Sequence, residues 1–160
     1  MPQWPKQSDC LRLFGNPSEP GWTSQHLVPI AVPFAMHMDD IPIRSIKVNK
    51  IAADSLSRVF TTIWNACGHD QAQVGKCGCD VYSGCFAIRP IRGGTRPSMH
   101  SFGLAIDINA PRNQLGEPAS RTLFQSDSIV TRAFKAEGWI WGGDWRGRRD
   151  AMHYQAAVVG

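Results

Sequence analysis

Two stretches of the sequence carry the spacing of apolar residues that is typical of amphipathic helices. In residues 52–66, apolar side chains recur every three or four positions, and a glycine follows soon after as a stop signal. The members of this stripe are Leu56, Val59, Phe60, Ile63 and Trp64. A second helix is expected within residues 126–139, with Ser126 or Asp127 as its N-cap and Gly138 at its end.

Alternating apolar and polar positions, and short apolar runs between turn residues, predict strands. The five stretches expected to form them are 42–49, 80–90, 103–109, 139–145 (a strand running into a tight turn) and 151–159. The alternation is cleanest in residues 103–109 (GLAIDIN), where the large apolar side chains share one face. Asp107 therefore leaves from the opposite face, beside the small side chain of Ala105.

The order of these elements predicts an α+β fold. Helices and strands are segregated and most strand connections are short, which favours an antiparallel sheet with helices packed on one side. We expect a single domain over residues 25–160, because no repeat or interdomain linker is visible. Residues 1–24 are rich in proline, serine and polar residues and are expected to form an extended arm on the surface.

Composition and charge narrow the possible partners. The 160 residues carry a net charge of +4, which favours polyanions such as nucleic acid or the anionic bacterial wall. The only dense basic cluster is RGRRD at residues 146–150, and no aromatic residues interleave with it as in RNA-binding motifs. No apolar run is long enough for a membrane span or a secretory signal, so we expect a cytoplasmic protein unless something else releases it.

Four of the five cysteines fall within residues 67–85, close to His69. A zinc knuckle or a disulfide is conceivable there, but the usual C-x-x-C pairs are absent and the close pair is C-x-C. We therefore expect reduced, partly buried thiols, and the spacing leaves the state of each one open. The four residues are Cys67, Cys77, Cys79 and Cys85.

The most informative residues are two histidines and two aspartates in otherwise small, apolar surroundings. Asp107 lies in an apolar strand, and a buried carboxylate needs a cation, a donor network or a solvent-open cleft. Together with His100 and His153 it offers the nitrogen and oxygen ligands of a catalytic zinc site. Asp150, three residues before His153, is placed to move protons, although it could instead pair with a neighbouring arginine.

These residues carry a resemblance to a known family. SMHSFGLAIDI resembles the S-x-H-x-x-G-x-A-x-D signature of the peptidase M15 family, the zinc peptidases related to D-Ala-D-Ala carboxypeptidase. WGGDW followed by DAMHY resembles the second half of that signature, and the likeness extends over residues 48–154. Within the family, the chain is most similar to the L-alanyl-D-glutamate endopeptidases of bacteriophage endolysins. The implied fold is that of the Hedgehog and D,D-peptidase domains.

The resemblance assigns roles to individual residues. It implies one zinc ion per chain held by His100, Asp107 and His153, with Asp150 as the catalytic acid and base. It also implies an arginine that steadies the substrate carbonyl, for which Arg89 is our choice; the alternative is that Arg89 anchors its loop. Candidate substrate-binding residues are Ser98, Arg92, Trp141, Asp144 and Tyr154.

The implied function is hydrolysis of the stem peptide of peptidoglycan, at the L-Ala–D-Glu bond, by a monomer that waits in the host cytoplasm for release to the periplasm and wall. Many relatives have a glutamate where this chain has Asp150, and the aspartate favours the endolysin branch. The alternatives are a D-Ala-D-Ala carboxypeptidase or dipeptidase with the same site, a non-catalytic zinc-binding module, and a basic nucleic-acid-binding domain. We expect neither nucleic-acid binding nor membrane insertion.

Overall fold

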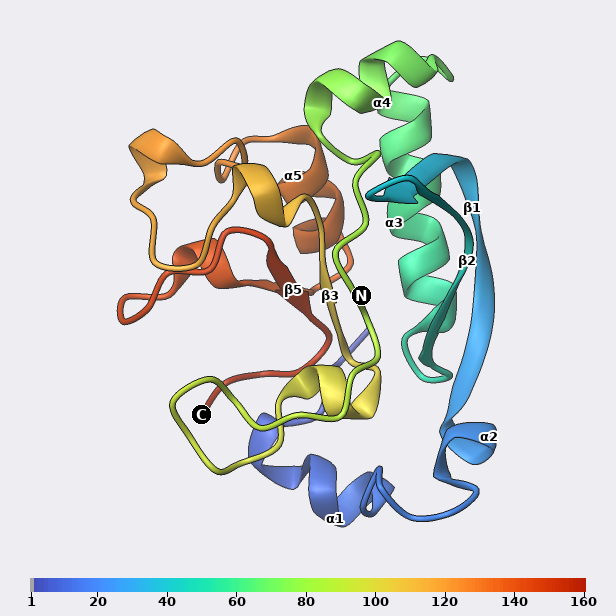
Figure 1. The fold of residues 1–160 in the computed structure, drawn as a ribbon, viewed down its shortest axis with the longest axis vertical. Helices are drawn as coiled ribbons and strands as arrows, with labels where there is room; N and C mark the ends of the chain where they lie inside the picture. The colour runs from blue at the N-terminus through green and yellow to red at the C-terminus, as the bar shows by residue number, and fades with distance from the viewer. Residues whose placement is uncertain (1) are drawn as a thin grey trace.

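The structure is a computed structural model that describes residues 2–160. A short antiparallel sheet lies at its centre, and a long β-hairpin with a helix flanks this sheet on one side (Figure 1). These elements form an α+β fold, as the order of the predicted elements indicated. Within the described residues, no helix is long and apolar enough to cross a membrane.

The hairpin consists of β1 (Leu27–Met38) and β2 (Ile41–Asn49), which pair antiparallel. Helix α3 (Ala53–Ala66) follows directly and packs against the hairpin and α5 (Ile129–Ala136); the predicted apolar stripe is buried there except for Trp64, which is partly buried. The expected strand at 42–49 and the expected helix at 52–66 are therefore confirmed. The second predicted helix is shorter than expected and begins after Ser128.

The central sheet has the strand order β3-β5-β4, so the last strand of the chain lies in the middle. These strands are β3 (Ala105–Asp107), β4 (Ile140–Trp141) and β5 (His153–Gln155), each much shorter than its predicted stretch. Both neighbours run antiparallel to β5. Leu104, Ile106 and Ile108 are fully buried, as their alternation predicts, and Asp107 leaves from the other face.

A tight contact joins the hairpin to the loop that precedes β3. Gly103 has φ of +66°, and a Cβ atom there would lie 2.6 Å from Leu27 Cδ2 and 2.9 Å from the Asn49 nitrogen. The fully buried Asn49 donates its backbone N–H to the Gly103 carbonyl and its side-chain Nδ2 to the Phe102 carbonyl, each at 2.9 Å. Only glycine fits this position, which explains its place three residues after His100.

The N-terminal segment is partly helical rather than extended. A 3₁₀ turn (η1, Gln7–Asp9) leads into α1 (Cys10–Phe14), and α2 (Trp22–His26) follows. The segment is anchored because Cys10 and Trp22 are buried in the core. Met1, which belongs to the predicted arm, lies outside the described residues.

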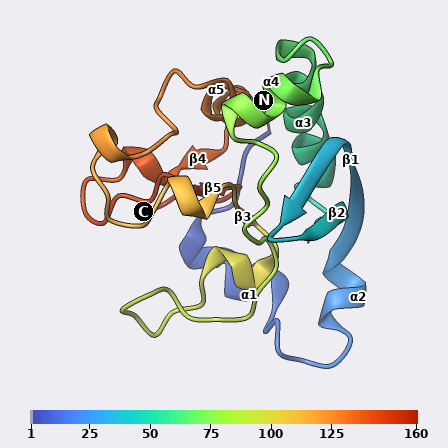
Figure 2. The same cartoon turned by 45° about the horizontal axis from the view of Figure 1, so that its top comes forward.

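The predicted strand at 80–90 is wrong, because this segment forms only isolated bridges. Val81 pairs with His37 of β1, whereas Tyr82 pairs with Ile108 beyond the end of β3. Adjacent residues of the segment thus pair with different sheets, and its further backbone hydrogen bonds to Asp107 and Asn109 do not form a regular strand. It crosses the molecule beside β3 before the loop 88–97 projects outward (Figure 2).

Two elements carried too weak a pattern to be predicted. Strand β1 contains Pro29 and Pro33, which argue against a strand interior, yet a two-stranded hairpin has free edges that tolerate proline. Helix α4 (Gln71–Cys77) is only two turns long and is capped by Asp70, which accepts the backbone N–H of Ala72 at 2.9 Å.

Candidate metal centre and active-site pocket

Three side chains at the centre of the molecule converge on one point. One ligand atom each from His100, Asp107 and His153 lies within 4.8 Å of the others. Asp107 and His153 are directly opposite each other across β3 and β5, and His100 comes from a 3₁₀ turn (η2, Met99–Phe102) that leads into β3. The sheet register therefore fixes two of the three side chains, and the short connection fixes the third.

The surroundings of His100 leave one ring nitrogen free for a cation. Its Nδ1 lies 2.7 Å from the carbonyl oxygen of Cys85, which can only accept a hydrogen bond, so Nδ1 carries the proton. The other nitrogen, Nε2, is buried without a hydrogen-bond partner and lies 3.2 Å from Asp107 Oδ2. Two lone pairs facing each other in a buried site indicate a missing positive charge between them.

His153 is arranged in the same way with its two nitrogens exchanged. Its Nε2 lies 2.8 Å from Gln155 Oε1, while Nδ1 faces Asp107 Oδ1 at 3.2 Å. Burial lowers the pKa of His153, but Asp107, together with Gln155 and Asp150, more than offsets this and raises the pKa above its ordinary value. Burial likewise raises the pKa of Asp107, yet its contacts with the two histidines hold it well below the usual range. The trio attracts positive charge, which fits a divalent metal.

Asp150 lies beside this trio in the turn that precedes β5. Its Oδ1 is buried without a hydrogen-bond partner. Burial raises the pKa of this carboxyl group above its ordinary value, so it holds a proton more readily than an exposed aspartate does. The position depends on Gly142, where a Cβ atom would lie 2.4 Å from the Asp150 carbonyl oxygen.

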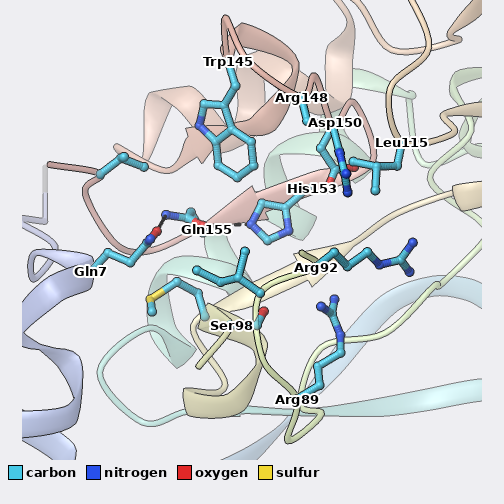
Figure 3. Close-up of a pocket in the computed structure, with 14 residues that line it drawn as sticks. Gln7, Arg89, Arg92, Ser98, Leu115, Trp145, Arg148, Asp150, His153 and Gln155 are labelled. Atoms are coloured by element: carbon cyan, nitrogen blue, oxygen red, sulfur yellow. Dashed lines mark hydrogen bonds between the residues drawn. The ribbon is translucent and has the colours of Figure 1, made fainter. Parts of the chain in front are cut away.

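A pocket of about 390 Å³ opens onto Asp150 and His153 (Figure 3). Its lining includes apolar side chains, among them Ile91, Leu115 and Trp145, whose ring centroid lies 5.2 Å from that of His153. The lining also includes guanidinium groups. Such a mixture suits a peptide that has both small apolar and acidic groups.

Three arginines face the pocket and form no ion pair among the described residues: Arg89, Arg92 and Arg148. The backbone of Arg89 is held from both sides, since its N–H donates to Ser101 Oγ at 3.1 Å and its carbonyl accepts from the Ser98 N–H at 2.9 Å. Arg92 lies on the exposed loop, and its charge acts to lower the pKa of Asp150. Arg89 is thus the better anchored cation.

Ser98 both lines the pocket and caps the turn that carries the first histidine. Its Oγ accepts the backbone N–H of His100 at 3.2 Å. The need for this cap accounts for a serine at position 98, two residues before His100.

The remaining three predicted substrate-binding residues lie away from the pocket. Tyr154 is fully buried and shares a hydrogen bond with Thr131 Oγ1 at 2.9 Å, because neighbours of His153 in a strand point to the opposite face. Trp141 is buried and donates its indole N–H to the Ala151 carbonyl at 2.8 Å, beside Asp150. Asp144 is exposed and pairs with Lys135 at 2.7 Å.

The cysteine segment holds neither a disulfide nor a metal cluster within residues 2–160. Cys67 and Cys77 approach each other, with sulfur atoms 3.9 Å apart. His69 stacks on Trp64, and its Nε2 contacts Asn65 Oδ1 at 2.8 Å. Its ring therefore interacts with these two residues and not with the cysteines.

Sequence reasoning missed several residues of this site, among them Trp145, Gln155 and Gln7. Trp145 lines the pocket, and Gln155 and Gln7 lie behind His153 (Figure 3). Gln155 follows His153 by two residues in a strand, so alternation alone could have placed it on the same face. No local pattern pointed to Gln7, which comes from the opposite end of the chain.

Comparison with known proteins agrees with the geometry. A family model described as D-alanyl-D-alanine carboxypeptidase, within peptidase M15, matches residues 92–156, somewhat less than half of the chain. No solved structure matches the chain. The matched segment contains the three converging side chains and Asp150. Over this segment, the chain is similar to the peptidase M15 family.

Proposed function

We propose that the protein is a zinc-dependent endopeptidase that hydrolyses the L-Ala–D-Glu bond in the stem peptide of peptidoglycan. The observation that carries the proposal is the convergence of His100, Asp107 and His153 beside the pocket, with His100 Nε2 buried and without a hydrogen-bond partner. The choice of bond rests on the resemblance to the endolysin branch, including an aspartate at position 150.

The chain's own groups account for the proton transfers. A zinc ion held by the trio would supply a Lewis acid that polarises the peptide carbonyl and lowers the pKa of water. Asp150 takes the proton of the attacking water and returns it to the departing amine, a role suited to its raised pKa. Arg89 donates hydrogen bonds to the carbonyl oxygen as negative charge develops there.

The proposed setting is that of a phage endolysin. In this proposal the enzyme stays in the host cytoplasm until the membrane is opened, and then acts on the wall as a monomer. The net charge of +4 supports attraction to the anionic wall, and this attraction should weaken as salt is added.

A second candidate is removal of the terminal D-Ala from the stem peptide. The description of the matching family model favours it, and the same trio and Asp150 would serve both reactions. The two activities differ only in which part of the stem peptide occupies the pocket. The products of digestion distinguish the two activities directly.

The test combines metal analysis with digestion of purified Gram-negative peptidoglycan, followed by mass spectrometry of the products. Wild type, Asp150→Ala and the exposed control Asp127→Ala are compared. We expect about one zinc per chain in all three proteins. Wild type and Asp127→Ala should release new N-terminal D-Glu ends and free L-Ala carboxyl ends, whereas Asp150→Ala should release none.

Each other outcome has a defined meaning. Release of D-Ala alone would assign the enzyme to the carboxypeptidase reaction and retain the site. Absence of zinc from wild-type protein, or full cleavage by Asp150→Ala, would overturn the proposal.

A further inference from the structure

Behind His153, a chain of hydrogen bonds leads away from the trio to the N-terminal segment. His153 Nε2 lies 2.8 Å from Gln155 Oε1, and Gln155 Nε2 lies 2.9 Å from Gln7 Oε1. The same Gln155 Nε2 donates to the Ala157 carbonyl at 2.9 Å. Gln155 is only 2% exposed, so its contacts with His153 and Ala157 are shielded from bulk water.

The orientation of the Gln155 amide follows from its partners. The Ala157 carbonyl can only accept, and Gln7 presents its oxygen, so the Gln155 NH₂ group must face both of them. Its carbonyl oxygen is thereby turned toward His153. An amide oxygen can only accept, which places the imidazole proton of His153 on Nε2.

This choice of tautomer decides whether His153 can bind a metal. With the proton on Nε2, the lone pair of Nδ1 points at the space shared with Asp107 and His100. If the amide were reversed, its NH₂ group would hydrogen-bond the Nε2 lone pair and the proton would move to Nδ1, facing the metal position. A partner on the outer nitrogen commonly fixes the tautomer of a metal-binding histidine.

The position of Gln7 depends on a clasp between the two ends of the chain. The Gln7 backbone N–H donates to the Val158 carbonyl at 2.8 Å, and the Val158 N–H donates to the Pro5 carbonyl at 2.8 Å. Lys6 and Val158 form an isolated parallel bridge. The clasp holds Gln7 against the wall of the pocket that lies beside Gln155 (Figure 3).

We infer that Gln155 and Gln7 are positioning residues that hold His153 in its metal-binding tautomer, so that the N-terminal segment helps to set the metal affinity of the site. The inference rests on the proposed metal site but not on the bond cleaved. The inference concerns the affinity of the site for zinc, which can be measured without substrate.

Two matched pairs of variants test it. Gln155→Leu removes the acceptor for His153, whereas Gln155→Glu keeps an acceptor oxygen at the same place. Gln7→Leu removes one of the two acceptors that orient the amide, whereas Gln7→Glu retains it. Zinc dissociation constants are measured by competition with a chelating dye, and the thermal midpoint of each zinc-free protein is recorded beside them.

We expect Gln155→Leu to weaken zinc binding by about 10- to 100-fold, the usual loss when an outer partner of a ligand histidine is removed. Gln155→Glu should bind zinc more tightly than Gln155→Leu, because one carboxylate oxygen still accepts from His153 Nε2, while the other replaces the donor that faces Gln7 and Ala157. Gln7→Leu should lose less zinc affinity than Gln155→Leu, because the Ala157 carbonyl still orients the Gln155 amide. Gln7→Glu should restore the wild-type value.

A spectroscopic readout separates tautomer control from general loosening. In nitrogen-edited NMR spectra of the zinc-loaded protein, the His153 Nε2–H should be protected from solvent exchange in wild type and in both glutamate variants. It should be lost or exchange rapidly in Gln155→Leu.

Equal zinc affinity in Gln155→Leu and wild type would overturn the inference, even if peptidoglycan cleavage proceeds as proposed. Should Gln155→Leu fail to fold, the Gln7 pair decides, and equal affinity of Gln7→Leu and Gln7→Glu would also overturn it. Failure of wild-type protein to bind zinc would instead refute the proposed function.

Discussion

Asp107 and His153 face each other directly across β3 and β5, with Oδ1 and Nδ1 3.2 Å apart. This cross-strand pair supplies two of the three candidate ligands, and the buried residues behind β3 fix its register. A slip of one residue would turn Asp107 into the core and Ile108 toward the pocket. The fold and the metal centre therefore depend on the same register.

Removal of the Asp107 charge should abolish tight zinc binding. Asp107→Asn keeps the size of the side chain but removes the negative charge that faces both histidines. We expect the zinc dissociation constant to rise by more than about 100-fold, beyond the effect of an outer partner. The measurement is the same dye competition, with the exposed Asp127→Asn as control. Unchanged affinity would show that Asp107 is not a ligand.

Gly142→Ala should impair catalysis without removing the metal. The added Cβ would lie 2.4 Å from the Asp150 carbonyl oxygen and 3.0 Å from its Cβ, so Asp150 must move. A displacement of about 1 Å in a catalytic group commonly lowers the rate by about 100-fold. The measurements are the cleavage rate and the zinc content of Gly142→Ala, each compared with wild type.

The matched control is Gly75→Ala, in helix α4, where the nearest atom to a new Cβ lies 3.5 Å away. This variant should cleave at the wild-type rate. Equal rates for Gly142→Ala and wild type would mean that the position of Asp150 does not limit the reaction.

Arg89→Ala should lower the rate of cleavage and leave zinc binding unchanged. A guanidinium group that stabilises a developing oxyanion commonly contributes about 100-fold or more to the rate. Single-turnover digestion is the measurement, and Arg44→Ala on the exposed edge of β2 is the control. If Arg92→Ala were the slower variant, the loop arginine would hold the role instead.

Tyr154→Phe should reduce stability but not activity. The Tyr154 hydroxyl lies in the core with Thr131 Oγ1 as its partner, and its loss should destabilise the fold by about 1–2 kcal/mol. Urea unfolding measures the stability, and peptidoglycan digestion measures the activity. A large loss of activity with unchanged stability would place the hydroxyl in the active site after all.

The ion pair between Glu137 and Arg58 should stabilise the protein in a pH-dependent way. Hydrogen bonds from Arg58 hold the pKa of Glu137 below its ordinary value, although partial burial opposes this. A carboxyl group whose folded-state pKa is depressed stabilises the fold above its unfolded pKa of about 4.3 and ceases to do so as pH falls through the folded value.

Glu137→Gln should therefore lower the thermal midpoint at neutral pH, and the difference from wild type should shrink toward about pH 3. Glu19→Gln, at an exposed site in the N-terminal segment, serves as control. A difference that stays constant over this range would exclude the ion pair as its source.

Much of the candidate site could be predicted because its information is local. His100 and Asp107 lie within one motif, and His153 and Asp150 within another, so their residue types and spacing indicate a zinc site before any fold is known. Strand alternation also placed Asp107 on the face away from the core.

The features that escaped prediction depend on contacts between distant segments. The 80–90 segment alternates in sequence, but its neighbours in space belong to two different sheets. Gln7 is a polar residue in a proline-rich stretch, and its role can be recognised only from its hydrogen bond with Gln155. Tyr154 is next to a ligand in sequence, yet the pleat of β5 turns it into the core.

The clasp between the chain ends has a consequence for how the molecule is made. Gln7 and Gln155 are 148 residues apart, and contacts of such high sequence separation form late and slow the folding of a domain. During synthesis Gln7 emerges early and cannot meet its partner until Gln155 has left the ribosome. The clasp should therefore be among the last contacts to form, so that the orientation of the Gln155 amide is set only when the fold is nearly complete.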